Sequence, residues 1–458
     1  MILGEVFERF AKGSPVCVMA RATLERALAP AAVDALFEEV AERQYTRTLV
    51  FSTVVDLMGT VVCRIRPSIH AAYQAKAEAI GASLRAVYDK LDRVETGVSA
   101  ALVHHSAQAL LPVIDALPGD RSAWLPGYRV KILDGSHLPG TEHRLKPLRT
   151  TRAGALPGQA LVVLDPERLL VCDALLCEDG HAQERSLTEA IVALVQPEEV
   201  WLADRNFCTT ALLFGMEARG GAFVIRQHAS TLTVVVQSEA IDRGRCATGE
   251  VTERTLELSH PDGRRLSVRR ITVTLDQPTR DGDTEIHILT NLPEVVTARQ
   301  VAELYRRRWT LETAFQELEA ALHGEIDTLG YPKAALFAFC LALVAYNVLA
   351  VVKAALRSVH GAKAGGEAVS AYYLADEIAG TYRGLSLAIP EVEWRVFQTL
   401  PAGELAQVLH DLAQRVRLSA FKKHPRGPKK PRPKQESGAQ VKHVATARLL
   451  KGQSHGTP

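Results

Sequence analysis

Hydrophobic positions in the first part of the chain recur with the spacing of helices. Apolar residues three and four apart run through segments 31–43 (AAVDALFEEVAER) and 76–94 (KAEAIGASLRAVYDKLDRV), which predicts amphipathic helices. The apolar run 49–63 (LVFSTVVDLMGTVVC) contains Asp56 and fits either a core helix or a buried strand. We therefore expect residues 1–120 to form a helical N-terminal region.

The hydrophobic period then changes to that of strands. Three short apolar or alternating segments, separated by turn residues, predict three strands: 128–133 (YRVKIL), 160–165 (ALVVLD) and 168–176 (RLLVCDALL). A helix, a strand, a helix and a strand follow in the patterns of 182–195, 200–203 (VWLA), 209–219 and 222–226 (AFVIR). This order of elements predicts an α/β core whose first part covers residues 121–227.

More strand patterns follow the core. Segments 231–237, 264–275 and 284–292 are rich in Val, Ile and Thr and are separated by Gly, Pro and Asp, which predicts a β-rich insertion over residues 228–296. The helical period returns only in LYRRRWTLETAFQELEAAL, within residues 297–324. A helical C-terminal region is expected over 325–411.

One stretch is long enough to span a membrane. Residues 334–352 (AALFAFCLALVAYNVLAVV) contain no charged side chain. The stretch is rich in Ala, holds Asn347 in its middle and stands alone, which favours a helix buried inside a large domain. A membrane span remains the alternative.

Composition places the chain among globular proteins. A length of 458 residues with 47% hydrophobic residues allows about three domains with real cores. The net charge of +2 gives by itself no reason to expect a polyanionic partner. The 7 cysteines form no C-x-x-C pair, and the start MILGEVFERF lacks the pattern of a signal peptide. These features favour a reduced, cytoplasmic protein.

Positive charge is concentrated near the C-terminus. The segment 422–434 (KKHPRGPKKPRPK) is rich in Lys, Arg and Pro, and no acid occurs between Asp411 and Glu436. Such a composition disfavours packing and regular helix but binds phosphates, so we expect residues 412–458 to be a basic, flexible tail that contacts DNA. A tail that serves only solubility is the alternative. The DNA-binding candidates are Lys422, Lys423, Arg426, Lys429 and Lys430.

Three acids stand where a catalytic site could form. Asp134 and Asp204 follow the strands 128–133 and 200–203, and Glu312 lies on the later helix. If these strands run parallel, both aspartates reach the carboxyl edge of the sheet, where open α/β sheets place their sites. Either Asp alone could simply form a turn or cap a helix. Together the carboxylates suit Mg²⁺ or Mn²⁺, and two ions roughly 4 Å apart can assist phosphoryl transfer.

Four polar residues line the edge of the apolar stripe on that helix. Helical spacing brings Tyr305, Arg308, Glu312 and Glu319 to one side of it. A solvated face with ion pairs four residues apart, such as Arg308 with Glu312, would account for the same pattern. The helix by itself therefore leaves both interpretations open.

In combination, these features resemble the DDE transposases of the bacterial insertion sequence four family. That family has a ribonuclease H core, a β-rich insertion and a helix with the motif Tyr-x2-Arg-x3-Glu-x6-Lys. Tyr305, Arg308 and Glu312 match the first three motif positions, and the resemblance covers roughly residues 127–434. Glu319 stands where the family has its lysine, which is understood to contact a DNA phosphate. An acid there would repel DNA, so either another cation replaces the lysine or the enzyme is weakened.

The resemblance implies cut-and-paste transposition. Asp134, Asp204 and Glu312 would hold two Mg²⁺ or Mn²⁺ ions, water would attack a phosphodiester, and the freed 3′-OH would attack again. Tyr305 and Arg308 would position the strand through phosphate contacts. The implied partners are double-stranded DNA, with its terminal inverted repeats and target, and further copies of the chain in a dimer or higher oligomer on DNA.

Other polar residues are weaker candidates. Arg226, at the end of strand 222–226, is a further phosphate contact, although an Arg at a strand end is commonly solvated. His323 follows Glu319 by one turn, just before Gly324, and could replace the missing lysine at the negative end of the helix dipole. Lys333 is a second replacement, and His137 and His143 lack the Cys/His spacing of a zinc site.

Two other functions remain open. A structure-specific nuclease of the same fold would share the acids, although the insertion and the length favour a transposase. A DNA-binding descendant that has lost activity would keep the basic tail and tolerate Glu319. Metal-dependent cleavage and strand transfer distinguish the three.

Overall fold

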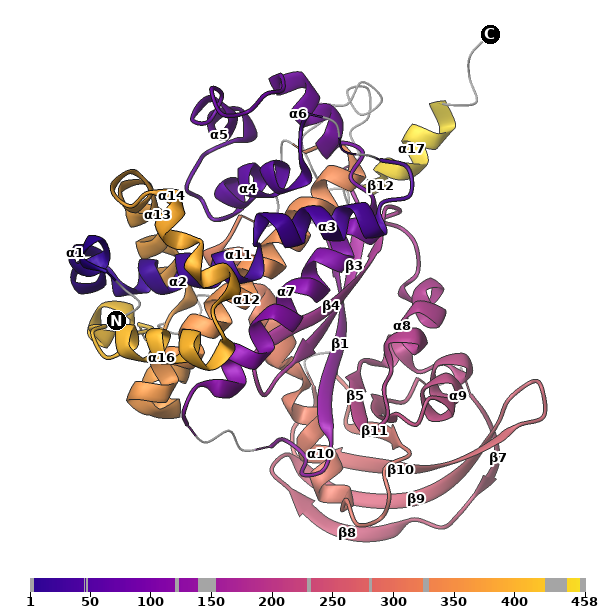
Figure 1. Cartoon of the computed structure of the whole chain (residues 1–458). Coiled ribbons are helices and arrows are strands. Elements are labelled where there is room, and N and C mark those ends of the chain that lie inside the picture. Colours follow the sequence, from indigo (N-terminus) through magenta and orange to yellow (C-terminus); the bar gives the residue numbers. More distant parts are fainter. Residues whose placement is uncertain are drawn as a thin grey trace, which may run out of the picture.

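The computed structural model consists of a helical part and a part built on one large sheet (Figure 1). N-terminal and C-terminal helices lie together in the helical part, although they are far apart in the sequence. The structure describes residues 4–44, 46, 48–119, 123–138, 154–228, 232–279, 282–323, 329–424 and 443–453.

The helical part is organised around one long helix, α12 (Pro332–Gly361). Each residue of α12 from Ala334 to Leu356 is buried, and the helix packs against α2, α4, α7 and α16. The surrounding N-terminal helices are α1 (Glu5–Gly13), α2 (Pro15–Ala27), α3 (Pro30–Val40), α4 (Phe51–Val62), α5 (Ile69–Gln74), α6 (Leu84–Leu91) and α7 (Thr96–Ala116). The C-terminal elements are the π-helix η5 (Ala362–Glu367), α13 (Ala371–Ala388), α14 (Glu391–Trp394), α15 (Val396–Thr399), α16 (Ala402–Ala413) and the 3₁₀ turn η6 (Leu418–Phe421).

Among the residues that the structure describes, two helices could cross a membrane by length and composition alone, namely α7 and α12 with its π extension. The most apolar 18-residue window is 100% buried inside the protein in α12 and 50% buried in α7. Asn347 in α12 accepts a hydrogen bond from the Val171 amide (2.8 Å) and donates to the Val171 carbonyl (2.9 Å) and to Ser106 (3.1 Å). Protein groups thus surround α12, and the expected core helix is what the structure contains.

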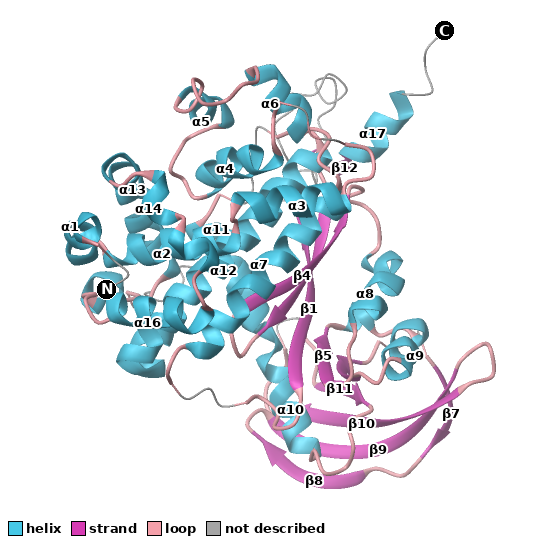
Figure 2. Ribbon diagram, viewed as in Figure 1, coloured by secondary structure: helices cyan, strands magenta, loops and turns pink. Residues whose placement is uncertain are grey.

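The sheet has the strand order β4-β3-β1-β5-β6-β11-β10-β9-β7, with β8 paired to β9. Strands β4, β3 and β1 are antiparallel, whereas β1, β5 and β6 are parallel (Figure 2). The core strands are β1 (Arg129–His137), β3 (Gln159–Asp165), β4 (Leu170–Cys177), β5 (Glu199–Ala203) and β6 (Ala222–Arg226). The expected order of three strands, helix, strand, helix and strand is confirmed.

The β-rich insertion extends the core sheet. β11 pairs antiparallel with β6, so the insertion strands continue the same sheet. The sequence patterns predicted β7, β10 and β11 but missed β8 and β9, because β8 is exposed on both faces and β9 buries the charged Glu253 among its apolar positions. The insertion strands are β7 (Thr233–Gln237), β8 (Ile241–Cys246), β9 (Gly249–Ser259), β10 (Arg265–Leu275) and β11 (Glu285–Thr290).

Different helices cover the two faces of the core sheet. Alternate residues of β1 belong to different clusters: Ile132 packs in the cluster of α7 and α12, whereas Leu133 packs in the cluster of α8 and α9. Position 134 therefore faces the side of α12, and position 135 the side of α8. The elements on the latter side are η2 (Glu184–Leu187), α8 (Thr188–Leu194), η3 (Arg205–Phe207) and α9 (Thr210–Ala218).

Three local predictions require correction. Strand β1 does not end at Asp134 but continues to His137, so the Asp-Gly pair lies within a strand and not in a turn. The helix expected over 304–322 is split into α10 (Ala298–Arg306), the 3₁₀ turn η4 (Arg307–Trp309) and α11 (Thr310–Ala321). Segment 76–94 contains a helix only at α6.

The C-terminal end of the chain returns to the sheet part. Strand β12 (His443–Ala445) pairs in parallel with β2 (Gly154–Leu156), and α17 (Thr446–Gln453) follows. Arg448 of α17 forms an ion pair of 2.6 Å with Asp179, in the loop after β4. These contacts hold the last described segment beside the loop that leads to Glu184.

Candidate active site

The pairing register places the two aspartates side by side. Parallel strands β1 and β5 pair from Arg129–Glu199 to Leu133–Ala203, and Asp134 and Asp204 are the next residues on the two chains. Adjacent strands lie about 4.8 Å apart, so both residues stand at one edge of the sheet. Asp204 also caps η3 by accepting a hydrogen bond from the Arg205 amide. Asp204 therefore both caps a helical turn, as the alternative explanation expected, and lies beside Asp134.

The third acid approaches this edge from α11. Glu312 lies in the first turn of α11, directly after the 3₁₀ turn η4. Within η4, the guanidinium of Arg307 lies over the Trp124 ring, 3.7 Å from its centroid, while the side chain of Arg308 is buried. These contacts of neighbouring arginines hold the tight turn that the helical periodicity did not predict.

Arg308 connects two of the acids. Its Nη1 donates to Oδ2 of Asp134 at 2.7 Å, and its Nη2 lies 3.4 Å from Oε1 of Glu312. The Asp134 and Glu312 carboxylates are therefore separated by no more than one guanidinium group and its two hydrogen bonds. The side chain of Arg308 is only 9% exposed, whereas that of Glu312 is 49% exposed.

The pKa shifts show how the site is charged. Burial raises the pKa of Asp134, the positive charge of Arg308 opposes this, and the negative charge of Asp204 raises it further. Burial lowers the pKa of Arg308, but the charges of Asp134, Tyr305 and Asp204 outweigh burial, so its pKa is raised overall. Burial also raises the pKa of Tyr305 to about 12. The phenol stays protonated and can donate a hydrogen bond near neutral pH.

Arg226 lies close to the same group of residues. Its charge acts on Tyr305, which places the end of β6 near α10. Its Nη2 is already engaged, at 2.7 Å from Oδ2 of Asp283. Arg226 is therefore a partly neutralised cation at the margin of the site.

The sequence analysis did not identify Glu184, which the structure brings to this edge. Burial raises the pKa of Glu184, and the negative charges of Asp134 and Asp204 raise it further. The Asn206 side chain, two residues after Asp204, donates a hydrogen bond to it. Helical periodicity assigned Glu184 to the start of a helix. The only signal in the sequence was the glycine that follows Asp134.

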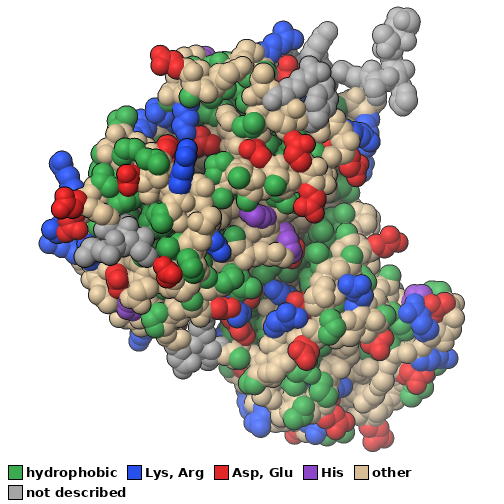
Figure 3. Space-filling model, viewed as in Figure 1, with side chains coloured by type: hydrophobic (Ala, Val, Ile, Leu, Met, Phe, Trp, Pro, Cys, Tyr) green, Lys and Arg blue, Asp and Glu red, His purple; other side chains and the backbone are tan. Residues whose placement is uncertain are grey.

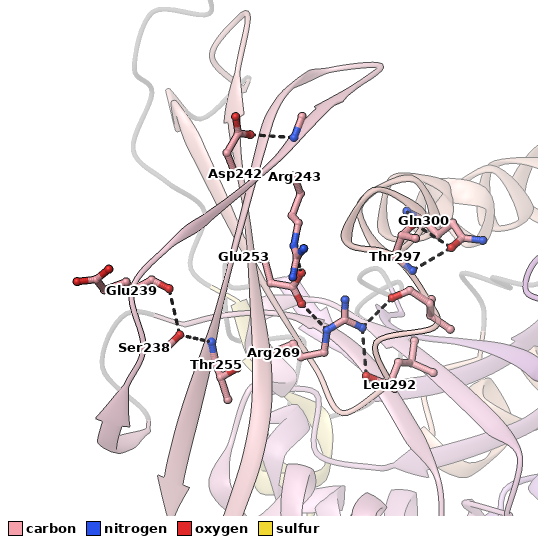
Figure 4. A network of polar contacts seen from close by, with 12 residues as sticks. Ser238, Glu239, Asp242, Arg243, Glu253, Thr255, Arg269, Leu292, Thr297 and Gln300 are labelled. Carbon is pink, nitrogen blue, oxygen red and sulfur yellow. Dashed lines mark hydrogen bonds and ion pairs between the residues drawn. The ribbon is translucent and has the colours of Figure 1, made fainter.

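The β insertion holds the start of α10 through a buried arginine, Arg269 of β10 (Figure 4). Its Nη1 donates to the carbonyl oxygens of Leu292 (3.1 Å), Pro293 (3.0 Å) and Val296 (2.8 Å). Its Nε lies 2.5 Å from Glu253, which also binds Arg243. The next residue, Thr297, caps α10 in a capping box with Gln300. Hydrogen bonds thus join the insertion to the segment that immediately precedes α10.

The proposed replacements for the lysine lie outside this group. Glu319 is exposed on α11. The helix ends at Ala321, so His323 does not continue its angular series as expected, and its backbone amide donates to the Val62 carbonyl at 2.8 Å. Lys333 lies 4.0 Å from Glu178 in an ion pair. Gly324 is outside the described residues.

A cation from another segment lies close to position 319. Nη2 of Arg64 is 3.3 Å from the carbonyl oxygen of Glu319 and 3.3 Å from that of Leu322. Arg64 is exposed and has the positive φ of 59° that non-glycine residues rarely adopt. Its guanidinium therefore stands at the negative end of α11, where a cation stabilises the helix.

Most of the basic tail is outside the described residues. This applies to Arg426, Lys429 and Lys430, and to His143 near the first aspartate. Lys422 and Lys423 are exposed beside α13, and Lys423 lies 3.4 Å from Glu317 of α11. His137 is exposed at the end of β1. On the space-filling surface, acidic and basic side chains are intermingled over both parts of the molecule (Figure 3).

Carboxylate oxygens at this edge are the donors that hard divalent cations prefer. A cationic group, the Arg308 guanidinium, already stands between Asp134 and Glu312, so the edge suits positive charge. Among the described residues, no three His, Cys, Asp or Glu side chains are close enough together to hold an ion. The donor chemistry fits a divalent cation, provided that Arg308 moves away from the carboxylates.

Comparison with known families agrees with this geometry. Residues 125–348 match the model of the transposase DDE domain. The matched region contains Asp134, Asp204 and Glu312, together with the whole β insertion. No curated protein matches the chain. The match supports a DDE transposase with a ribonuclease H-like core, a family of DNA-binding proteins.

Proposed function

We propose that this protein is a DNA transposase of the insertion sequence four family, which cleaves DNA at the ends of an insertion sequence and joins it to a target. The observation that carries the proposal is that Arg308 bonds both Asp134 and Glu312 at the edge of the sheet where Asp204 follows the strand next to Asp134. The spacing of Tyr305, Arg308 and Glu312, combined with the β insertion, supports this family in particular.

Asp134, Asp204 and Glu312 would hold divalent cations, Mg²⁺ or Mn²⁺ and two in number. When bound, such ions polarise the phosphate and lower the pKa of the attacking water or hydroxyl. The chain itself supplies rigid placement of the acids. Asp134 lies on β1 and Asp204 directly follows the neighbouring strand β5, while Glu312 lies in the first turn of α11.

Arg308 and Tyr305 contact the DNA strand in this proposal. A phosphodiester offers the guanidinium an anionic partner with bidentate geometry. We expect Arg308 to exchange its bonds to Asp134 and Glu312 for bonds to phosphate when DNA binds, which frees carboxylate oxygens. Tyr305 stays protonated and donates a hydrogen bond to the same strand. Arg226 is a further phosphate contact, after release from Asp283.

The missing lysine defines the main alternative. Glu319 carries negative charge where the family has a positive charge, which favours a DNA-binding descendant that no longer cleaves. Arg64 counters that argument, because its guanidinium lies against the backbone of Glu319. We propose that Arg64, in preference to His323, supplies the cation on this side of the catalytic helix.

The remaining regions would bind DNA and partner subunits. We assign DNA binding to the basic segment after Lys422 by its charge, and to the helical N-terminal region by the role that the resemblance implies. Acting on both ends of an element requires at least two active sites, so we expect a dimer or higher oligomer on DNA. The site of action is bacterial DNA, which places the enzyme in the cytoplasm.

The test is a cleavage and joining assay. The substrate is DNA that carries the inverted repeats flanking the coding sequence, with Mg²⁺ or Mn²⁺ added. Replacement of Asp134, Asp204 or Glu312 with Ala should abolish cleavage and leave DNA binding largely intact. Asp262→Ala, in the exposed turn between β9 and β10, is the control and should cleave normally.

Three outcomes separate the candidate functions. Cleavage followed by joining supports a transposase. Cleavage without joining identifies a nuclease of the same fold. Binding to the inverted repeats without cleavage, under both metals, identifies an inactive descendant.

A further inference from the structure

We propose that Glu184 is a fourth acid of this site, which fixes the turn after Asp204 and adds its negative charge where the cation binds. It would act as a positioning residue, because its carboxylate touches β1 and the Asp204 turn and does not complete a three-ligand group. The inference rests on the proposed function, which requires the cation. It goes further by adding a residue from a different part of the chain.

The closest contact of Glu184 is with the backbone of β1. A Cβ atom built on Gly135 would lie 1.8 Å from Oε1 of Glu184 and 2.9 Å from its Cδ. Gly135 does not have the positive φ that would by itself require glycine. A glycine at position 135 therefore leaves the space that the Glu184 carboxylate occupies against β1, directly after Asp134.

Hydrogen bonds on both sides fix Glu184 in this position. The Asn206 side chain donates to its carboxylate, and Nε of the adjacent Arg185 donates to the Asn206 carbonyl at 2.9 Å. Residues 184 and 185 thus hold Asn206 by both its side chain and its backbone. Just upstream, Nε2 of Gln159 donates to the Ala182 carbonyl at 2.8 Å. The turn that carries Asp204 is braced by the segment that carries Glu184.

Glu184 also reaches the site from a different direction than Glu312 does. Asp134 and Gly135 are consecutive on β1, so they point to opposite faces of the sheet. Glu312 arrives from α11 and shares Arg308 with Asp134, whereas Glu184 lies on the Gly135 side. Acids therefore flank the edge from both faces. A negative charge on the second face strengthens the attraction for a divalent cation held by the two aspartates.

The experiment measures cation binding directly, on the full-length protein without DNA. Mn²⁺ is titrated, and the free ion is followed by electron paramagnetic resonance. Glu184→Gln keeps the size and polarity of the side chain but removes its charge, and should weaken Mn²⁺ binding roughly 10-fold or more, as outer partners of metal ligands do. Glu184→Asp should restore part of the affinity. Glu189→Gln removes the same charge from the exposed side of α8 and should bind as the unsubstituted protein does.

Gly135→Ala provides an independent variant. Its methyl group cannot coexist with the present position of Glu184, so this variant should also lose Mn²⁺ affinity. The double variant Gly135→Ala/Glu184→Gln should bind Mn²⁺ only slightly more weakly than Gly135→Ala, because both changes remove the same contact. Should Gly135→Ala fail to fold, the Mn²⁺ affinity of the nearly isosteric Glu184→Gln still tests the inference.

Two results would overturn the inference in different ways. Equal Mn²⁺ affinity of Glu184→Gln and Glu189→Gln, with Asp134→Asn clearly weaker, rejects Glu184 and leaves the proposed function intact. Absence of Mn²⁺ binding by the unsubstituted protein, both without DNA and with inverted-repeat DNA present, rejects the cation site itself, and with it both proposals.

Discussion

Replacing Arg269 with Met should loosen the start of α10, the helix that carries Tyr305. Arg269 is buried and forms an ion pair of 2.5 Å with Glu253. It also donates to the carbonyl oxygens of Leu292, Pro293 and Val296, which immediately precede the cap of α10. Met fills much of the same volume but offers no donor. The substitution therefore removes the bonds that join β10 to the segment just before α10 (Figure 4).

The expected magnitude follows from burial. Removing one partner of a buried ion pair costs about 3–5 kcal/mol, because the remaining polar groups lose their partner. Glu253 keeps Arg243, at 2.7 Å, so the larger part of the loss falls on the carbonyl oxygens before α10. For a cooperative unit of 150–250 residues, this corresponds to a midpoint lower by roughly 10 °C. Arg265→Met, on the same strand, is the matched control. Arg265 and its partner Glu257 are 49% and 41% exposed, so that change should cost about 1 kcal/mol or less.

Two measurements check this reasoning. Thermal unfolding of both variants is followed by circular dichroism, and hydrogen exchange is measured over residues 292–306 by mass spectrometry. Faster exchange in Arg269→Met, confined to residues 292–297 and to α10, is the expected pattern, with cleavage reduced in parallel. If Arg269→Met unfolds and exchanges like Arg265→Met, Arg269 does not hold the start of α10.

Three shorter predictions concern other parts of the molecule. Asn347→Ala leaves the buried Val171 amide and carbonyl without that partner and should lower the free energy of unfolding by about 2–5 kcal/mol, measured by urea denaturation. The hydrogen bond to Asp173 raises the pKa of His104 above its usual 6.5. The protonated His104 therefore stabilises the fold fully below pH 6.5, and this contribution is lost as pH rises through the raised folded-state pKa. The free energy of unfolding of His104→Gln should depend less on pH in that window than that of the unsubstituted protein. Glu319→Lys removes a repulsive charge and should tighten DNA binding with only a modest change in cleavage. Rescue of an otherwise inactive protein by Glu319→Lys would instead mark a decayed enzyme.

The sequence predicts the core of the fold well, because its signals are local and repeated. Each core strand is a short apolar run with clear turn residues, and the two helices between them have the spacing of amphipathic elements. The side-by-side position of Asp134 and Asp204 follows from the parallel pairing of β1 and β5, although β1 continues past Asp134. Burial of α12 could be inferred from its Ala content and from Asn347, which needs polar partners inside the protein.

The features that sequence patterns miss depend on contacts between distant segments. The break between α10 and α11 is held by Arg307 on Trp124 and by Arg308 on Asp134, and neither partner is near the helix in the sequence. The sequence pattern predicts that Arg269 is an exposed strand residue. In the fold it is buried, because its three carbonyl partners lie in the segment after β11. Glu184 has the pattern of a solvated helix start, and only the fold brings it to Gly135.

The position of Arg308 makes the binding of cations and DNA depend on each other. Without DNA, its guanidinium neutralises Asp134 and Glu312, so a divalent cation must compete with it. We expect a DNA phosphate to draw the guanidinium away and to leave the carboxylates more negative, which should raise Mn²⁺ affinity several-fold. By linkage, Mn²⁺ must then tighten DNA binding by the same factor.

Titrating Mn²⁺ with and without inverted-repeat DNA measures this coupling. The same titration with Ca²⁺ tests whether a second divalent cation shows it. Arg308→Gln should bind Mn²⁺ more tightly than the unsubstituted protein in the absence of DNA and show little further gain with it. Equal Mn²⁺ affinity with and without DNA in the unsubstituted protein would mean that the guanidinium does not compete for the cation site.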